Sequence, residues 1–266
     1  MNSPGLEKTV INKINYDRSP DAADKDKAAW QGVMAVSKPV GVSSFRIVQK
    51  VRHLLGIKKV GHTGTLDPFA SGVLVICVGR PATRLISRLM EGDKEYEATL
   101  QLGVTTETQD PEGSIIDQRP VPELNERVLE ECLENFRGKQ LQTPPSYSAL
   151  KHKGKPLYYY ARRGIKVYKE PRQIEVKKLS CLNFGKDTMT INVVCSKGTY
   201  IRTLAADIGE FLGCGAYLSR LTRVRNGFFS IDECLPGEVL FNDDAAGKDV
   251  LLQYLLPVEE ATKLLV

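Results

Sequence analysis

The sequence predicts an α+β fold, with a mixed, largely antiparallel sheet flanked by helices and loops. Segments with strand and helix periodicity follow one another without the strict strand–helix alternation of a doubly wound parallel sheet. Residues 96–102 and 189–195 alternate apolar and polar side chains, as strands do when they bury one face of a sheet. At 266 residues the chain can bury a large core without disulfide or metal cross-links.

The first half of the chain combines short apolar strands with capped helices. Ser43 or Ser44 can cap a helix whose apolar residues recur at helical spacing as far as Gly56. Pro81 suits the first turn of a second helix. We therefore expect, in order, strand 32–37, helix 43–56, strand 73–78, helix 81–90 and strand 96–102.

The second half follows the same rules. Gly138 and Gly213 each come directly after an amphipathic segment and are expected to end it. Two alternating segments are expected to pair with each other as strands. The expected elements are helix 123–136, strands 174–176 and 189–195, helix 199–212, strand 224–231 and a closing helix over 255–266.

Composition excludes several classes of protein. The six cysteines lie at least 14 residues apart and there are three histidines, so paired zinc or redox spacing is missing and we expect no metal. No apolar run is long enough to span a bilayer, and residues 1–30 lack the apolar core of a secretory signal. We expect a cytoplasmic protein with free thiols that does not associate with membranes.

The positive charge is concentrated in one segment. The net charge is +5, but residues 137–172 carry ten Lys and Arg and one acidic residue, while residues 236–266 carry six acidic residues and two basic ones. Half of the ten tyrosines also lie in 137–172. A charged surface exposed to solvent would explain the charge alone. The interleaved tyrosines favour RNA binding by a projecting loop or short helix, because basic groups neutralise phosphates and aromatic rings stack on unpaired bases.

Residues 61–72 (GHTGTLDPFASG) form the segment that points to chemistry. Three glycines and a proline specify a tight loop, and Pro68 restricts Asp67 to extended conformations. A loop of this kind is more often an ordinary turn than an active site. The phosphate-binding, dinucleotide-binding, zinc-protease and serine-hydrolase motifs are all missing from the sequence.

This loop strongly resembles the GHTGxLDPxAxG motif of the TruB family of tRNA pseudouridine-55 synthases. Further motifs of that family follow in the expected order, at residues 38–44, 93–96, 143–151, 195–204 and 221–223. The resemblance implies a pseudouridine synthase fold with an RNA-gripping insertion. It also implies an isomerase, without cofactor, that converts uridine to pseudouridine at position 55 in the T loop of tRNA.

The resemblance assigns roles to individual residues. Asp67 is implied as the nucleophile acting on a flipped-out base, with first attack at C6 or at the ribose left open. Arg202 would keep Asp67 ionised, and Tyr200 would accept the C5 proton. Tyr96 and Tyr200 would flank the uracil, Leu221 would form a pocket wall, and His62 would pack on the RNA. Substrate binding is also assigned to Lys38, Lys151 and Lys153. Without the resemblance, Arg202 would be interpreted as a residue at a helix start and Tyr96 as core packing.

The same resemblance suggests a domain organisation. Residues 1–30 are expected to be a flexible extension, 31–235 the catalytic domain with 137–172 as its basic tRNA-gripping insertion, and 236–266 a short acidic segment without the PUA-like domain of many relatives. The expected partner is the T arm of tRNA, bound by a monomer. The alternative is a non-catalytic tRNA-binding module or tRNA folding chaperone, for which Asp67 would be dispensable.

Overall fold

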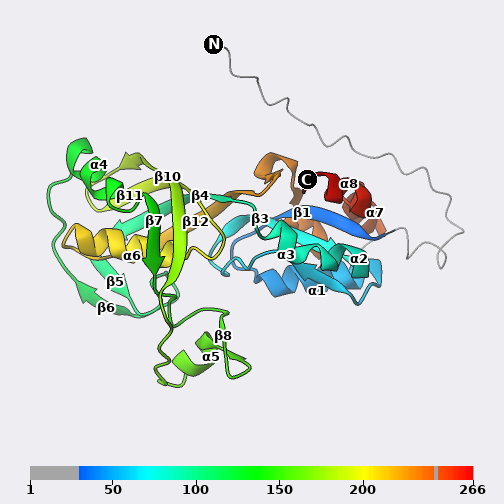
Figure 1. Ribbon diagram of the computed structural model, residues 1–266, viewed down its shortest axis with the longest axis horizontal. Coiled ribbons are helices and arrows are strands. Elements are labelled where there is room, and N and C mark those ends of the chain that lie inside the picture. The colour runs from blue at the N-terminus through cyan, green and yellow to red at the C-terminus, as the bar shows by residue number, and fades with distance from the viewer. Residues whose placement is uncertain (1–29, 243–244, 266) are drawn as a thin grey trace, which may run out of the picture.

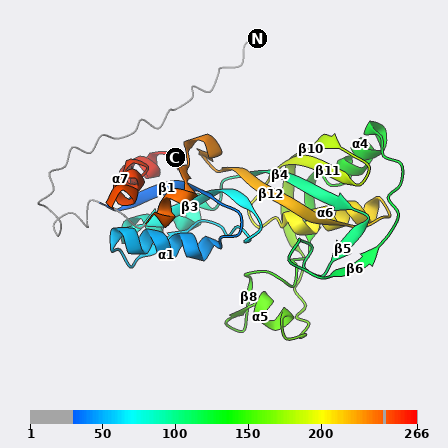
Figure 2. The ribbon, with the colours of Figure 1, turned by 180° about the vertical axis from the view of Figure 1, so that it is seen from behind.

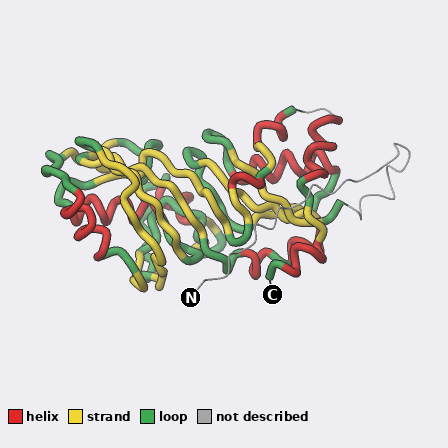
Figure 3. The backbone as a smooth tube through the Cα atoms, turned by 90° about the horizontal axis from the view of Figure 1, so that it is seen from above, coloured by secondary structure: helices red, strands yellow, loops and turns green. Residues whose placement is uncertain are grey.

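A computed structural model describes residues 30–242 and 245–265. The described residues form one twisted sheet of eleven strands. It extends along the long axis of the molecule (Figures 1 and 3). Its main path is β14-β1-β3-β12-β4-β11-β10-β7, with β2 and β13 added at β3 and β12, and β15 added at β1. Pairing is antiparallel except at β1/β14 and β3/β12, so the expected α+β class is confirmed.

The strands of the large sheet are β1 (Gly32–Lys38), β2 (Val60–His62), β3 (Ser71–Val78), β4 (Lys94–Leu102), β7 (Gly138–Gln142), β10 (Arg172–Phe184), β11 (Thr188–Cys195), β12 (Ala216–Asn226), β13 (Phe229–Ser230), β14 (Leu235–Pro236) and β15 (Leu256–Pro257). Two small hairpins lie apart from it, formed by β5 (Val104–Thr106) with β6 (Ile115–Gln118) and by β8 (Lys151–His152) with β9 (Lys155–Pro156). The α-helices are α1 (Ser44–Leu55), α2 (Gly79–Arg84), α3 (Ile86–Leu89), α4 (Glu126–Glu134), α5 (Leu157–Ala161), α6 (Ile201–Phe211), α7 (Ala245–Gln253) and α8 (Val258–Lys263). Short 3₁₀ turns cover Ile231–Glu233 and Gly237–Phe241.

The end of the sheet formed by β1 and β3 is covered on both faces. Successive side chains of a strand point to opposite faces, so Met34 joins the core under α1 while Val33 joins a second core. That second core includes Ala82 of α2 and Ala261 of α8. Both strands are therefore apolar almost throughout, as expected for strands without a solvent face.

The other end, around β4 and β11, is covered on one face. Leu100 and Ile191 are fully buried in the same core as Leu204 of α6. On the opposite face Thr99 and Thr190 share a hydrogen bond of 3.1 Å between their hydroxyls. The two ends are visible on either side of the molecule in Figures 1 and 2, and a segment carrying β8 and α5 projects between them.

The predicted start and end of the first helix match the structure, whereas the next two predicted helices differ from it. The side chain of Ser43 accepts a hydrogen bond from the backbone of Arg46 and caps α1, and Gly56 ends the helix at φ +64°. The predicted helix 81–90 is instead two short helices, α2 and α3. Helix α4 is shorter than 123–136 at both limits, because Asn125 caps its start and it ends at Glu134. Gly138, expected to end this helix, instead begins β7.

The prediction of a strand at 224–231 was wrong in both limits. Strand β12 begins at Ala216, and Gly227, at φ +60°, turns the chain before β13. Register shifts near Ser219 and Val224 break the regular alternation of side chains along β12, which hid the strand from pattern analysis. Strand β7 also went unpredicted.

The C-terminal segment packs on the sheet rather than forming one closing helix over 255–266. Strand β15 pairs with β1, and α8 follows it. Residues 1–29, the predicted flexible extension, lie outside the described residues. Trp30, assigned to that extension, is buried in the main core, with Lys248 of α7 over its ring at 3.9 Å.

Candidate active site

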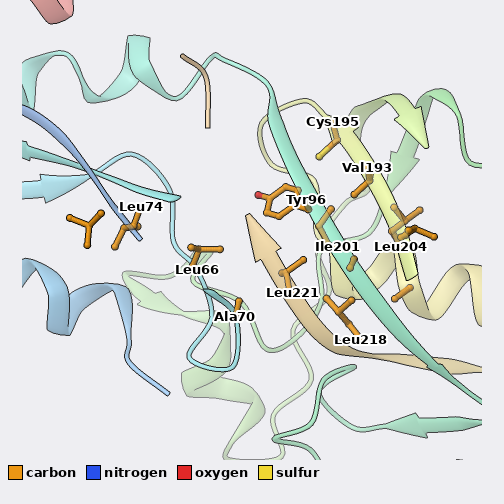
Figure 4. Close-up of a cluster of buried hydrophobic side chains, with 14 of the residues drawn as sticks. Leu66, Ala70, Leu74, Tyr96, Val193, Cys195, Ile201, Leu204, Leu218 and Leu221 are labelled. Atoms are coloured by element: carbon orange, nitrogen blue, oxygen red, sulfur yellow. The ribbon is translucent and has the colours of Figure 1, made fainter. Parts of the chain in front are cut away.

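The loop between β2 and β3 carries Asp67 and is fixed on both sides of it. The buried hydroxyl of Ser44 donates to the carbonyl of Leu66 and accepts from its amide, both at 2.8 Å. Leu66 itself points into the core near Leu221 (Figure 4). The amide of Gly41 donates to the carbonyl of Pro68 at 2.8 Å. Asp67 therefore sits on a rigid support, which a reactive group requires.

Lys38 helps to fix this loop and does not line the pocket described below. Its ammonium group is buried and donates to the carbonyls of Val42 at 2.6 Å, Pro39 at 2.8 Å and Pro68 at 3.4 Å. Burial lowers the pKa of Lys38 to about 8. This geometry supports a structural role for Lys38 in place of the predicted role in substrate binding.

Asp67 forms an ion pair with Arg202, as the resemblance implied. The Nε of Arg202 lies 3.0 Å from Oδ2 of Asp67. Arg202 stands in the first turn of α6, and its side chain is 5% exposed, whereas that of Asp67 is 36% exposed. The carboxylate therefore remains accessible from the pocket while its partner is held inside the protein.

Arg202 also joins three segments that are distant in sequence. Its Nη1 lies 2.9 Å from Oδ2 of Asp110 and donates to the carbonyl of Thr108 at 2.8 Å. Its Nη2 donates to the carbonyl of Tyr147 at 2.7 Å. The Asp67 loop, the β5–β6 connection and the base of the projecting segment thus meet at one guanidinium group.

Asp110 is a site residue that sequence reasoning missed. It is buried, accepts from the amide of Glu112 at 3.0 Å and from the hydroxyl of Thr108, and shares Arg202 with Asp67. Two local signals mark it: it precedes Pro111, as Asp67 precedes a proline, and Gln109 before it adopts φ +62°.

Opposing effects act on the carboxyl of Asp67. Burial raises its pKa above the ordinary value of 3.8, and Arg202 lowers it. Asp110 raises the pKa further, and Lys38 lowers it. The net direction is upward, because burial, the largest of these effects, disfavours the charged form of the carboxyl group.

The pocket beside Asp67 encloses about 620 Å³, within the size range of small-ligand sites. Three predicted residues line the pocket: Tyr96 lies in β4, Tyr200 directly precedes α6, and Leu221 lies in β12. Figure 4 labels Tyr96 and Leu221. The side-chain amide of Gln142 holds Tyr200 through both backbone groups, at 2.8 and 3.0 Å. Burial raises the pKa of both tyrosines, which keeps them neutral.

Three other predicted binding residues lie outside this pocket. His62 is half-buried in β2, its Nδ1 accepts from the amide of Gly64 at 3.3 Å, and burial lowers its pKa, which favours the neutral ring. Lys151 and Lys153 are exposed on the β8–β9 hairpin. The residues just before that hairpin, 148–150, do line the pocket.

Four further cations line the pocket and were not predicted as site residues. Lys94 and Arg223 are buried, and Arg172 and Lys197 are exposed. With Arg202 they outnumber Asp67, the one acidic side chain among the described residues of the lining. The pocket therefore suits an anionic or electron-rich ligand.

Two properties of the described residues bear on cofactors and membranes. Across residues 30–242 and 245–265, His, Cys, Asp and Glu side chains form no group of three or more that could hold a metal ion. Within the same ranges, none of the helices is long and apolar enough to cross a membrane.

Two family models match the chain. The N-terminal domain of the TruB family pseudouridylate synthases matches residues 52–201, and the tRNA pseudouridylate synthase B C-terminal domain matches residues 202–263. The border between them falls inside the pocket, between Ile201 and Arg202 of α6.

Individual relatives agree with these models. A tRNA pseudouridine synthase B of Desulfotalea psychrophila is 52% identical over 239 residues, which is 88% of this chain and 96% of the relative. One of Chromobacterium violaceum is 52% identical over 202 residues, 76% of this chain and 65% of the relative. A chain in the crystal structure of a Cbf5–Nop10–Gar1 complex superposes with a TM-score of 0.66 at 25% identity, over 94% of this chain and 69% of that chain. The protein therefore belongs to the TruB family of pseudouridylate synthases.

Proposed function

We propose that this enzyme converts uridine to pseudouridine at position 55 in the T loop of tRNA, with Asp67 as the nucleophile. The names of its relatives support tRNA as the substrate. The observation that carries the role of Asp67 is its ion pair with the buried Arg202 in the lining of a pocket large enough for a nucleobase. Residues 31–235 would form the catalytic unit.

The reaction exchanges one bond for another. The N1–C1′ bond of uridine breaks, the uracil turns, and C5 bonds to C1′ while the C5 proton leaves and N1 gains a proton. Asp67 would attack the nucleoside as a carboxylate, and Arg202 would favour that ionised form. The bond between Asp67 and the nucleoside would break again before the product leaves, which restores the carboxylate. Tyr200 lines the same pocket as Asp67, and its oxygen would accept the proton from C5 as its own hydroxyl proton passes to water, so that the neutral phenol is restored.

A uracil that enters this pocket would have to leave its base stack. Flipping a nucleotide costs a few kcal/mol, and stacking on an aromatic ring returns about 1–3 kcal/mol per base. Tyr96 and Leu221 would supply that apolar, aromatic environment. The basic insertion, residues 137–172, would hold the T arm, and the enzyme would act as a monomer.

The test compares the natural enzyme with Asp67→Asn on an unmodified tRNA transcript. The substitution keeps the size of the side chain and removes its nucleophilicity, so we expect pseudouridine formation to be abolished while tRNA binding stays nearly unchanged. Mapping pseudouridine in the product and measuring Kd separately give both readouts. Undiminished product from Asp67→Asn would contradict the mechanism and favour the tRNA-binding or chaperone alternative.

A second experiment tests which uridine of the tRNA is modified. A transcript in which U55 is replaced by cytidine should bind but yield no pseudouridine elsewhere in the T loop. Pseudouridine at another site of that transcript would show that position 55 is not the specific target.

A further inference from the structure

Three cations are buried around the pocket without a carboxylate partner. Lys38, Lys94 and Arg223 are 0%, 6% and 2% exposed. Each donates to main-chain carbonyls, and among the described residues none has a carboxylate oxygen within 4.0 Å. A buried charge without a carboxylate in contact costs free energy, so the two of these cations that line the pocket, Lys94 and Arg223, are candidates for a functional role.

Arg223 is the most firmly held of the three. Its Nε donates to the carbonyl of Val73 at 2.7 Å and its Nη2 to that of Gly64 at 3.1 Å. It lies opposite Tyr96 in the β12–β4 pairing, with the guanidinium carbon 6.0 Å from the centre of the Tyr96 ring. Both residues line the pocket, so this charge is fixed beside the site assigned to the uracil.

Arg223 differs from the two buried lysines in the kind of charged group that it carries. A guanidinium does not lose its proton in proteins, whereas burial lowers the pKa of Lys38 and Lys94 to about 8. Its field reaches neighbouring groups, because it contributes to the lowered pKa of His62. Arg202, by contrast, is shared between Asp67 and Asp110.

We propose that Arg223 stabilises the negative charge that the uracil ring carries during the reaction. This inference rests on the proposed function. If the N1–C1′ bond breaks first, its electron pair remains on the ring. If the carboxylate adds at C6 first, the displaced electron pair moves to O4. Both routes place one negative charge on the ring, which is discharged when C5 bonds to C1′, loses its proton, and N1 is protonated.

An RNA phosphate is a less suitable counter-ion for this group. A phosphate is attached to the backbone and remains at the pocket mouth, where the exposed Arg172 and Lys197 are available. Arg223 is 2% exposed and already binds two carbonyls inside the protein. A flat ring entering the pocket can approach it, whereas a tetrahedral phosphate diester cannot.

The test separates charge from hydrogen bonding at one position. Single-turnover rates on a tRNA transcript are measured for Arg223→Gln, which can donate a hydrogen bond without charge, and for Arg223→Lys, which keeps the charge. We expect Arg223→Gln to slow the reaction by about 100-fold or more without changing the Kd for tRNA, and Arg223→Lys to retain most of the rate. Arg225→Gln is the matched control, because Arg225 lies on the same strand and forms a half-buried ion pair with Glu95 outside the pocket lining; its rate should stay unchanged.

Equal loss of rate in Arg223→Gln and Arg223→Lys would assign Arg223 to holding the loop and overturn the proposal, as would full activity of Arg223→Gln. Loss of activity in Asp67→Asn alongside full activity of Arg223→Gln would leave the proposed function intact. A measurement on the natural enzyme is independent of folding of the variants. 5-Nitrouracil, which is anionic at neutral pH, should inhibit more strongly than neutral uracil, and equal inhibition would also contradict the proposal.

Discussion

At the scale of single residues, the site is a balance of charges around one carboxyl group. Asp67 must be ionised to act, burial opposes ionisation, and Arg202 favours it. Asp110 competes for the same guanidinium group and repels the charge on Asp67. The rate should therefore depend on pH in a way that substitutions at Asp110 can alter.

We expect the rate to fall on the acid side as Asp67 becomes protonated, at a pH above its ordinary pKa of 3.8 because burial raises that pKa. Asp110→Asn removes a nearby negative charge, which lowers the pKa of Asp67 and moves the acid limb to lower pH. Single-turnover rates across the acid range, with thermal unfolding as a check on folding, measure the shift. An acid limb that moved to higher pH in Asp110→Asn would contradict this account of the charges.

At the scale of elements, the projecting segment that carries β8 and α5 is hydrogen-bonded to residues that line the pocket. Arg137 pairs with Glu130, and its Nε donates a hydrogen bond to the carbonyl of Leu179 in β10. The projecting segment therefore begins only after β7. The amides of Leu157 and Tyr158 in α5 donate to the carbonyls of residues 150 and 148, which line the pocket. The exposed lysines of the β8–β9 hairpin therefore lie directly beyond the pocket wall.

Replacing Lys151, Lys153 and Lys155 with Ala should weaken tRNA binding and flatten its salt dependence, by about 1 in slope for each phosphate that is no longer neutralised. Titrations of tRNA binding at several salt concentrations measure both effects. The charge-matched control replaces three exposed lysines outside the insertion, Lys58, Lys186 and Lys263. An equal change in slope for both triple variants would show that net charge, and not the insertion, governs binding.

At the scale of the whole molecule, the two ends of the sheet meet at the parallel pair β3/β12. Gly72 of β3, which has φ +98°, lies opposite Arg223 of β12. A Cβ atom on residue 72 would come within 2.3 Å of the Arg223 carbonyl oxygen. Beside it the hydroxyls of Ser71 and Thr222 are 3.0 Å apart. This close approach brings the Asp67 loop, carried by one end, next to Leu221 and Arg223, carried by the other.

Gly72→Ala should therefore destabilise the fold by about 2–4 kcal/mol and also abolish activity, because it forces β3 and β12 apart. Gly213→Ala is the control for backbone strain alone: Gly213 has φ +81° and no atom within 4 Å of its Cβ position, so it should cost about 1–2 kcal/mol and leave activity intact. Urea unfolding measures both. Equal destabilisation by the two substitutions would show that close approach at Gly72 contributes nothing.

Local sequence determined much of this protein. The α+β class and helix α1 follow from periodicity and capping, which depend on neighbours a few residues apart. The Asp67 loop was also recognisable, because glycine permits and proline fixes the backbone conformations of a tight loop, and its family was recognised from the motif that this loop carries. These features need no knowledge of distant contacts.

Only the tertiary structure decided which residues share the pocket. Arg223, noted in the sequence only as part of the motif at 221–223, lines the pocket, whereas Asp110 pairs with Arg202 and Lys38 fixes the loop without lining it. The β12 register shifts and the β3/β12 parallel pair leave little trace in local periodicity, because the residues that pair there, such as Ser71 and Thr222, are far apart in the sequence. Charge balance and burial at the pocket depend on such long-range contacts, so they became visible only once the chain was folded.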